Sequence, residues 1–197
     1  MNYDSWFAST IGADYIEEID NDRLLDYCIN LKNKNTGRTF SNVGGWQSND
    51  LNFNDVELQE LLSNIYSRLI QMKSDLGIKD IFKLAIKSMW VNINNRSNFN
   101  KPHCHPGSFI SGVYYVDIDA DRSGDIVFLN PNAALDYHWD INWFKDGIGQ
   151  TISSTACYYK PKKTKLILFP GWLWHYVEPS NSDKERISIS FNTELTN

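Results

Sequence analysis

Several residue types that define other classes of protein are scarce in this 197-residue chain. It has three cysteines at wide spacing, which disfavours a disulfide framework and leads us to expect reduced thiols inside a cell. Lysine and arginine total 19 against 24 acidic residues, and the net charge of −5 argues against a nucleic-acid partner. No apolar run is long enough to cross a bilayer, and the N-terminus lacks the pattern of a signal peptide. We therefore expect a cytoplasmic protein with no membrane partner.

Aromatic residues, in contrast, are abundant. They make up 14% of the chain, with seven Trp and ten Tyr, and they favour a β-rich core because flat rings pack well on pleated sheets. Hydrophobic residues at 42% and charged residues at 22% are typical of a soluble globular protein. The length suits one sizeable core better than two domains.

Two helices are predicted in the first half of the chain. A cap at residues 21–22 precedes apolar residues at helical spacing, and the helix should end before Gly37. A second amphipathic helix should run from a cap at 54–55 to about residues 76–77.

From residue 81 onward the apolar pattern has a period of two, which predicts strands. The first is a long strand at 81–93, with apolar groups on both faces. Further strands are predicted at 109–118, 125–129, 155–160, 164–169, 174–178 and 187–191. This order predicts a β-rich α+β fold, namely a double-stranded β-helix (a cupin-like jelly roll) flanked by N-terminal helices. The segment 130–155, which contains His138, is expected to be a long loop over one mouth of the barrel.

His103 and His105 are two residues apart, so on an extended strand their imidazoles point to the same side. Such a pair alone is weak evidence for a metal site, and a purely structural role is the simplest interpretation. Zinc with Cys104 competes, but Cys104 has the opposite strand parity and should face away from any ion that the histidines share.

His175 strengthens the case for a metal site. It follows an apolar strand and the turn Pro170-Gly171, so a returning strand could bring it to the same mouth. The alternative is an ordinary edge-strand histidine.

Arg186 and Ser188 share one face of the last predicted strand, while apolar residues occupy the other. A buried guanidinium needs an anion, and a carboxylate ligand would suit its fork. The alternative is a surface arginine in a charged turn.

Three blocks together resemble the Fe(II)/2-oxoglutarate-dependent oxygenases of the prolyl-hydroxylase-like superfamily. They are the Ser-Asn-x-Gly-Gly-Trp-Gln-Ser segment at 41–48, the His-x-His-Pro block at 103–115, and the Phe-Pro-x-Trp-Leu-x-His block at 169–188 with its Arg-Ile-Ser. More narrowly, the chain is similar to an oxygenase family common in cyanophages and bacteria, which would place a phage-encoded member in the host cytoplasm. The resemblance implies one oxygenase domain over 1–197, with helices at about 21–77 and the jelly-roll core at about 81–193.

The resemblance also implies roles for individual residues. His103 and His175 would bind Fe(II), and Arg186 would hold 2-oxoglutarate with help from Ser188 and Tyr115. Asn92 joins this cofactor-binding set. His105 departs from the pattern, because the superfamily usually has a carboxylate at that position. We take His105 as the third catalytic metal ligand.

Another completion of the site stays open: His105 could lie behind the ligands while water or a carboxylate, Asp117 or Asp125, takes the third position.

The implied reaction is hydroxylation of a protein side chain or an amino-acid-like metabolite, using O2 and releasing succinate and CO2. Trp90 and Asn92, with Trp172 and Trp174, are candidates for pocket walls. The segment at 41–48 would contact substrate or form a turn.

Two rivals remain for the whole protein. One is a non-catalytic jelly-roll module, and the other is a three-histidine cupin dioxygenase without a cosubstrate. A homodimer is kept open.

Overall fold

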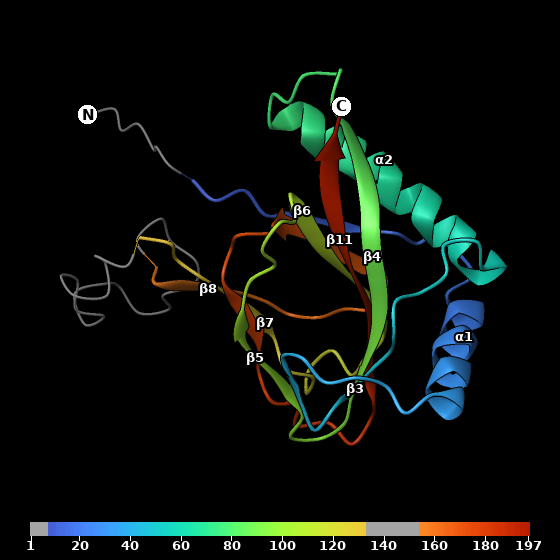
Figure 1. Ribbon diagram of the computed structural model, residues 1–197. Coiled ribbons are helices and arrows are strands. Elements are labelled where there is room, and N and C mark those ends of the chain that lie inside the picture. The colour runs from blue at the N-terminus through green and yellow to red at the C-terminus, as the bar shows by residue number, and fades with distance from the viewer. Residues whose placement is uncertain (1–7, 133–153) are drawn as a thin grey trace.

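The two longest strands, β4 (Lys83–Asn94) and β11 (Arg186–Thr196), pair antiparallel along their length in a computed structural model of the chain (Figure 1). The structure describes residues 8–132 and 154–197. The other elements in chain order are β1 (Gly12–Tyr15), α1 (Asn21–Lys34), β2 (Asn42–Val43), β3 (Trp46–Gln47), the 3₁₀ turn η1 (Val56–Leu58), α2 (Gln59–Asp75), β5 (Phe99–His103), β6 (Ile110–Asp117), β7 (Ile126–Leu129), β8 (Ala156–Tyr159), β9 (Lys165–Pro170) and β10 (His175–Val177).

These strands form two antiparallel sheets. The large sheet has the order β1-β9-β6-β11-β4-β3, and the small sheet has the order β2-β5-β10-β7-β8. The sheets do not join into a closed barrel among the residues described. The predicted double-stranded β-helix with N-terminal helices is confirmed, as an open two-sheet structure.

Helices α1 and α2 cover the outer face of the large sheet (Figure 1). The apolar stripe of α2, including Leu61, Ile65 and Leu69, is buried against the outward residues of β4 and β11. No helix in the described part of the chain is long and apolar enough to cross a membrane. The main core therefore lies between helices and sheet, which leaves the space between the two sheets for a site.

The helix starts differ slightly from the prediction. Asp20 caps α1 by accepting a hydrogen bond from the Arg23 amide at 3.0 Å, where residues 21–22 were expected to be the cap. Asn21 is instead buried, because its side chain bonds the Val116 carbonyl and the Tyr114 hydroxyl. The second helix begins with η1 before α2, close to the predicted cap.

The simple alternation predicted for β4 is interrupted by a bulge. Asn192 of β11 faces Ser88, but the next residue, Thr193, faces Ile86, so Lys87 is the extra residue. This shift lets both Ile86 and Met89 enter the helix-covered core.

All the strands predicted after residue 81 are present close to their expected bounds, except that β11 continues to Thr196 where its end was expected at 191. The sequence reasoning missed β1, β2, β3 and β5, which are short and partly polar. Most of the expected loop at 130–155, including His138, lies outside the described residues. At its two ends Asn130 hydrogen-bonds the carbonyls of Ser154 and Thr155.

Thr193 provides a test of how β11 holds β6. Its buried hydroxyl donates to the Ile110 carbonyl at 2.8 Å and accepts from the Ile110 amide at 3.0 Å, just beyond the end of the β11–β6 ladder. Thr193→Val should cost about 1–3 kcal/mol for each backbone group left unpaired, measured by urea unfolding. The exposed Thr196→Val is the matched control and should change stability by less than about 0.5 kcal/mol. Equal effects in the two variants would contradict this account.

Candidate metal centre

A cavity of about 450 Å³ lies between the two sheets. The large sheet contributes polar side chains from the inner faces of β4 and β11, and the small sheet contributes residues of β5, β7 and β10. The residues from β4 and β11 include Ser88, Trp90, Asn92, Arg186, Ser188 and Ser190. The cavity is therefore polar along one wall, unlike the apolar core on the other side of the same sheet.

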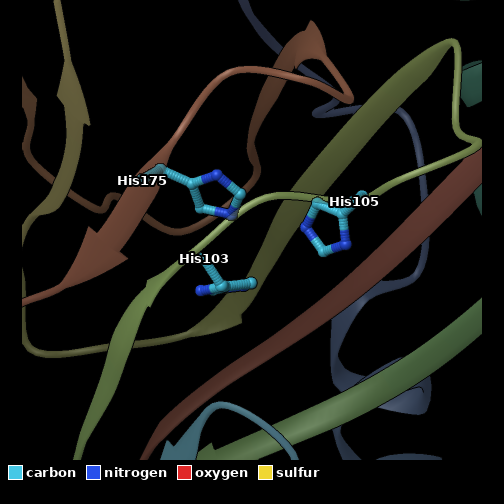
Figure 2. Close-up of side chains that lie close together, drawn as sticks. All are labelled: His103, His105 and His175. Carbon is cyan, nitrogen blue, oxygen red and sulfur yellow. The ribbon is translucent and has the colours of Figure 1, made fainter.

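His103, His105 and His175 meet at this cavity, with their rings turned toward one another (Figure 2). One potential ligand atom from each lies within 4.8 Å of the others. His103 ends β5 and His175 begins β10, and the two are direct cross-strand partners. Their ring centroids are 4.3 Å apart.

His105 is held beside this pair by the backbone. Its amide donates to the Gly171 carbonyl at 2.7 Å, while the Gly171 amide donates to the Phe109 carbonyl at 3.0 Å. A Cβ at position 171 would lie only 2.3 Å from the Ser108 carbonyl oxygen, so this close approach requires glycine. The Pro170-Gly171 turn therefore positions two histidines at once.

Backbone carbonyls orient two of the rings. His103 Nδ1 lies 2.7 Å from the Lys101 carbonyl, and His175 Nδ1 lies 2.9 Å from the Leu173 carbonyl. Because a carbonyl oxygen can only accept, Nδ1 carries the proton in each ring. The lone pair of each neutral imidazole is then on Nε2, an arrangement that typically supports metal binding by histidine.

Burial lowers the pKa of all three imidazoles. Desolvation is the largest cause, and it brings the pKa of His105 to about 4 and that of His175 to about 3, helped by the neighbouring imidazoles. The pKa of His103 is also lowered by burial, against the opposing effect of its bond to Lys101. All three rings are therefore neutral at pH 7, as metal ligation requires.

No carboxylate joins this cluster among the described residues. Asp117 is instead paired with Lys184 at 2.7 Å, and Asp125 does not line the cavity. Cys104 lines the cavity but contributes no atom to the group of ligands. The geometry thus favours His105 over a carboxylate from Asp117 or Asp125 as the third ligand.

Arg186 is a buried cation in the same cavity, 3% exposed, and it forms no ion pair with a described residue. Its guanidinium makes only long bonds to hydroxyls, donating from Nη1 to Ser188 at 3.3 Å and from Nη2 to Tyr115 at 3.4 Å. Its Nε is buried and has no hydrogen-bond partner among the described residues. An unpaired buried guanidinium is costly, so the site is suited to a bound anion.

The other two members of the predicted cofactor set occupy different positions. Tyr115 is fully buried and does not line the cavity; Arg186 lies over its ring, with Cζ 4.9 Å from the centroid. Asn92 lines the cavity and donates to the Ser190 hydroxyl at 3.0 Å. Tyr115 therefore supports the arginine, while Asn92 faces the ligand space.

These residues fit the groups that the sequence resemblance implies. Three neutral nitrogen donors suit Fe(II), and a buried arginine without a counter-ion suits the carboxylate of 2-oxoglutarate.

The predicted pocket walls are confirmed only in part. Trp90 and Asn92 line the cavity, whereas Trp172 and Trp174 do not and are 54% and 52% exposed. These two belong to the turn after β9, so their rings point outward. Their assignment as pocket walls was wrong.

The segment at 41–48 both forms a turn and reaches the site. It links β2 of the small sheet to β3 of the large sheet, and Ser48 anchors it by exchanging hydrogen bonds with Val91. Ser41 and Gln47 line the cavity. The Ser41 hydroxyl lies 3.5 Å from His103 Nε2 and accepts a bond from Asn100 at 3.1 Å.

Sequence reasoning missed several cavity residues. Ser190 and Asn192 share the inward face of β11 with Ser188, so strand parity could have identified them. Arg38 and Asp50 also line the cavity, but no local pattern signals that.

The profile of the 2OG-Fe(II) oxygenase family matches residues 88–192, more than half of the chain. This chain belongs to that family and is a 2-oxoglutarate- and Fe(II)-dependent oxygenase. No curated protein matches the sequence.

Solved structures with the same fold include a prolyl-4-hydroxylase from Pseudomonas putida, with a TM-score of 0.64 and 12% identity over 94% of this chain and 92% of that one. A viral collagen prolyl hydroxylase from Paramecium bursaria Chlorella virus-1 has a TM-score of 0.60 and 13% identity over 93% and 94%. The epimerase SnoN from nogalamycin biosynthesis has a TM-score of 0.68 and 12% identity over 94% and 76%. At such identities the likeness shows the fold alone.

The role of His105 can be tested by metal titration. His105→Ala should weaken Fe(II) binding at least ~10-fold in anaerobic calorimetry, because loss of a ligand should cost no less than loss of a supporting partner. Cys104→Ala is the adjacent control and should bind Fe(II) like the unmodified protein. Unchanged Fe(II) affinity in His105→Ala would show that the imidazole is not a ligand.

Proposed function

We propose that this oxygenase hydroxylates a C–H bond of an amino-acid-like metabolite or a protein side chain. The observation that supports this most directly is the meeting of three neutral imidazoles and a buried, unpaired arginine at one cavity. A non-catalytic module has no need of such an arrangement, whose buried cation lowers stability unless an anion pairs with it.

In this proposal His103, His105 and His175 hold Fe(II). Arg186 binds the far carboxylate of 2-oxoglutarate, Ser188 adds a hydroxyl beside it, and Tyr115 fixes the guanidinium from behind. The two sites lie on opposite sheets, with the metal ligands next to β5 and β10 and the anion site on β11. A molecule that chelates the metal at one end and meets Arg186 at the other would bridge the sheets.

Fe(II) and 2-oxoglutarate, when bound, supply the activation of O2, with release of succinate and CO2. The chain supplies binding, orientation and a shielded space. Apolar residues around the histidines, such as Phe128 and Phe169, contact the His175 ring and limit water there.

Replacing the usual carboxylate by His105 changes the charge of the centre. Three neutral imidazoles leave both positive charges of Fe(II) uncompensated, so anionic ligands should bind more strongly than at a site with a carboxylate ligand. Asp125 is not part of the ligand cluster and does not line the cavity.

We further propose that the described residues form one catalytic domain. Both helices pack on the same sheet that carries Arg186, so they share its core. Size-exclusion chromatography with light scattering would determine whether the protein is a monomer or a homodimer.

The activity can be tested without knowing the substrate. Purified protein with Fe(II) and 2-oxoglutarate in air should form succinate slowly, because 2-oxoglutarate can be turned over at a low rate without the substrate to be hydroxylated. His175→Ala, which loses a ligand, should reduce the rate to that of a protein-free control. Succinate formation equal to this background in the unmodified protein, together with no binding of 2-oxoglutarate, would contradict the proposal.

The role of Arg186 in binding 2-oxoglutarate can be tested directly. Arg186→Met should weaken 2-oxoglutarate binding by about 30-fold or more, since truncating one partner of a buried charge pair costs about 2–5 kcal/mol. Fe(II) binding should persist in the same variant and thereby report a folded site. Arg96→Ala, which removes an exposed arginine paired with Asp183, is the control. Equal affinity for 2-oxoglutarate in Arg186→Met and the unmodified protein would contradict this role of Arg186.

A further inference from the structure

Arg38 and Asp50 place a cation and an anion side by side in the lining of the cavity that contains the three histidines. Both residues line the same cavity as the three histidines. Arg38 Nη2 and Asp50 Oδ1 are 2.6 Å apart. Arg38 is held in place because its amide donates to the Gln47 carbonyl at 2.8 Å and its guanidinium lies over the Phe40 ring.

The pair leaves much of its binding capacity unused. Only one guanidinium nitrogen of Arg38 bonds the Asp50 carboxylate, and its Nε is buried with no hydrogen-bond partner in the described part of the chain. An unpaired buried donor is costly, so a small turn of the guanidinium toward a ligand carboxylate would be favourable. Asp50 uses one oxygen for Arg38, and its half-exposed side chain leaves the other able to accept.

Stability alone is a weak explanation for this pair. Its side chains are 25% and 56% exposed, and pairs this exposed contribute about 0–1 kcal/mol. Arg68 and Asp14 form a second pair with the same exposures, but neither residue lines the cavity. Arg68 and Asp14 are therefore a control pair of equal exposure located outside the cavity.

The charges also indicate what the wall would recognise. A second dicarboxylate is disfavoured there, because Asp50 would repel it. A basic side chain would satisfy Asp50 but leave Arg38 without a new partner, and an acidic side chain would do the reverse. A molecule with a carboxylate and an ammonium on the same carbon atom satisfies both residues at once.

We propose that Arg38 and Asp50 form the recognition site for a free α-amino acid, whose carboxylate binds Arg38 and whose ammonium binds Asp50. This rests on the proposed function, because the amino acid is the molecule to be hydroxylated. The cavity volume of about 450 Å³ falls in the ~300–1,000 Å³ range of small-molecule sites. In this arrangement the side chain of the bound amino acid would extend from Arg38 and Asp50 toward the histidines. Trp90 and Gln47 line the same cavity.

The test is calorimetry under nitrogen, with protein loaded with Fe(II) and 2-oxoglutarate so that no turnover occurs. The twenty L-amino acids are titrated singly, and the best binder is compared with its decarboxylated amine, its des-amino acid and its N-acetyl amide. At least one free amino acid should bind, and each analogue should bind at least ~10-fold more weakly, since the amine and the des-amino acid each lose one charge pair and the N-acetyl amide loses both. Stronger binding of the N-acetyl amide would indicate a residue within a peptide and would overturn the proposal.

Variants then test whether Asp50 and Arg38 are the two residues that bind the amino acid. Asp50→Asn and Arg38→Gln should each weaken amino-acid binding at least ~10-fold, whereas Asp14→Asn and Arg68→Gln should leave it unchanged. Each variant should still bind 2-oxoglutarate like the unmodified protein. Equal losses in both pairs, or no binding of any amino acid while 2-oxoglutarate binds normally, would overturn this proposal alone. Failure of 2-oxoglutarate to bind would overturn the proposed function as well.

Discussion

The antiparallel pairing of β10 with β5 is the interaction on which the site depends. It places His175 directly opposite His103, although the two are far apart in sequence. A one-residue slip of this pairing would turn one imidazole to the other face of the sheet, because side chains alternate along a strand. The turn at Gly171 then adds His105 through a backbone hydrogen bond. The positions of the three histidines that would hold the metal are thus set by main-chain contacts.

The opposite sheet provides the second half of the site through a division of its two faces. On β11, Ile187 and Ile189 pack outward into the helix-covered core, while Arg186 and Ser188 face the cavity. The burial of apolar surface by the helices offsets the cost of holding an unpaired guanidinium inside. The same strand therefore contributes to fold stability through its outward residues and to the candidate ligand site through its inward residues, because successive side chains alternate between the two faces of a sheet.

Much of this could be predicted from the sequence because it rests on local patterns. The period of two in β11 predicted that Arg186 faces inward. The strand parity expected for His103 and His105 does not apply, because β5 ends at His103 and Cys104 lines the cavity with both histidines. What could not be predicted depends on long-range pairing. The two-residue strands β2 and β3 carry no periodic signal, so the position of Arg38 on the cavity was missed. The exposed Trp174 failed as a pocket wall because aromatic composition does not show on which side of a turn a ring lies.

The central claim is that three imidazoles hold the metal while Arg186 holds the far end of the cosubstrate in the same cavity. A crystal structure of the protein soaked anaerobically with Fe(II) and 2-oxoglutarate tests it most directly. We predict one metal ion bound to ring nitrogens of His103, His105 and His175, with a carboxylate of 2-oxoglutarate against the Arg186 guanidinium. A metal ion ligated by a carboxylate side chain in place of His105, or a cosubstrate that does not contact Arg186, would contradict the account.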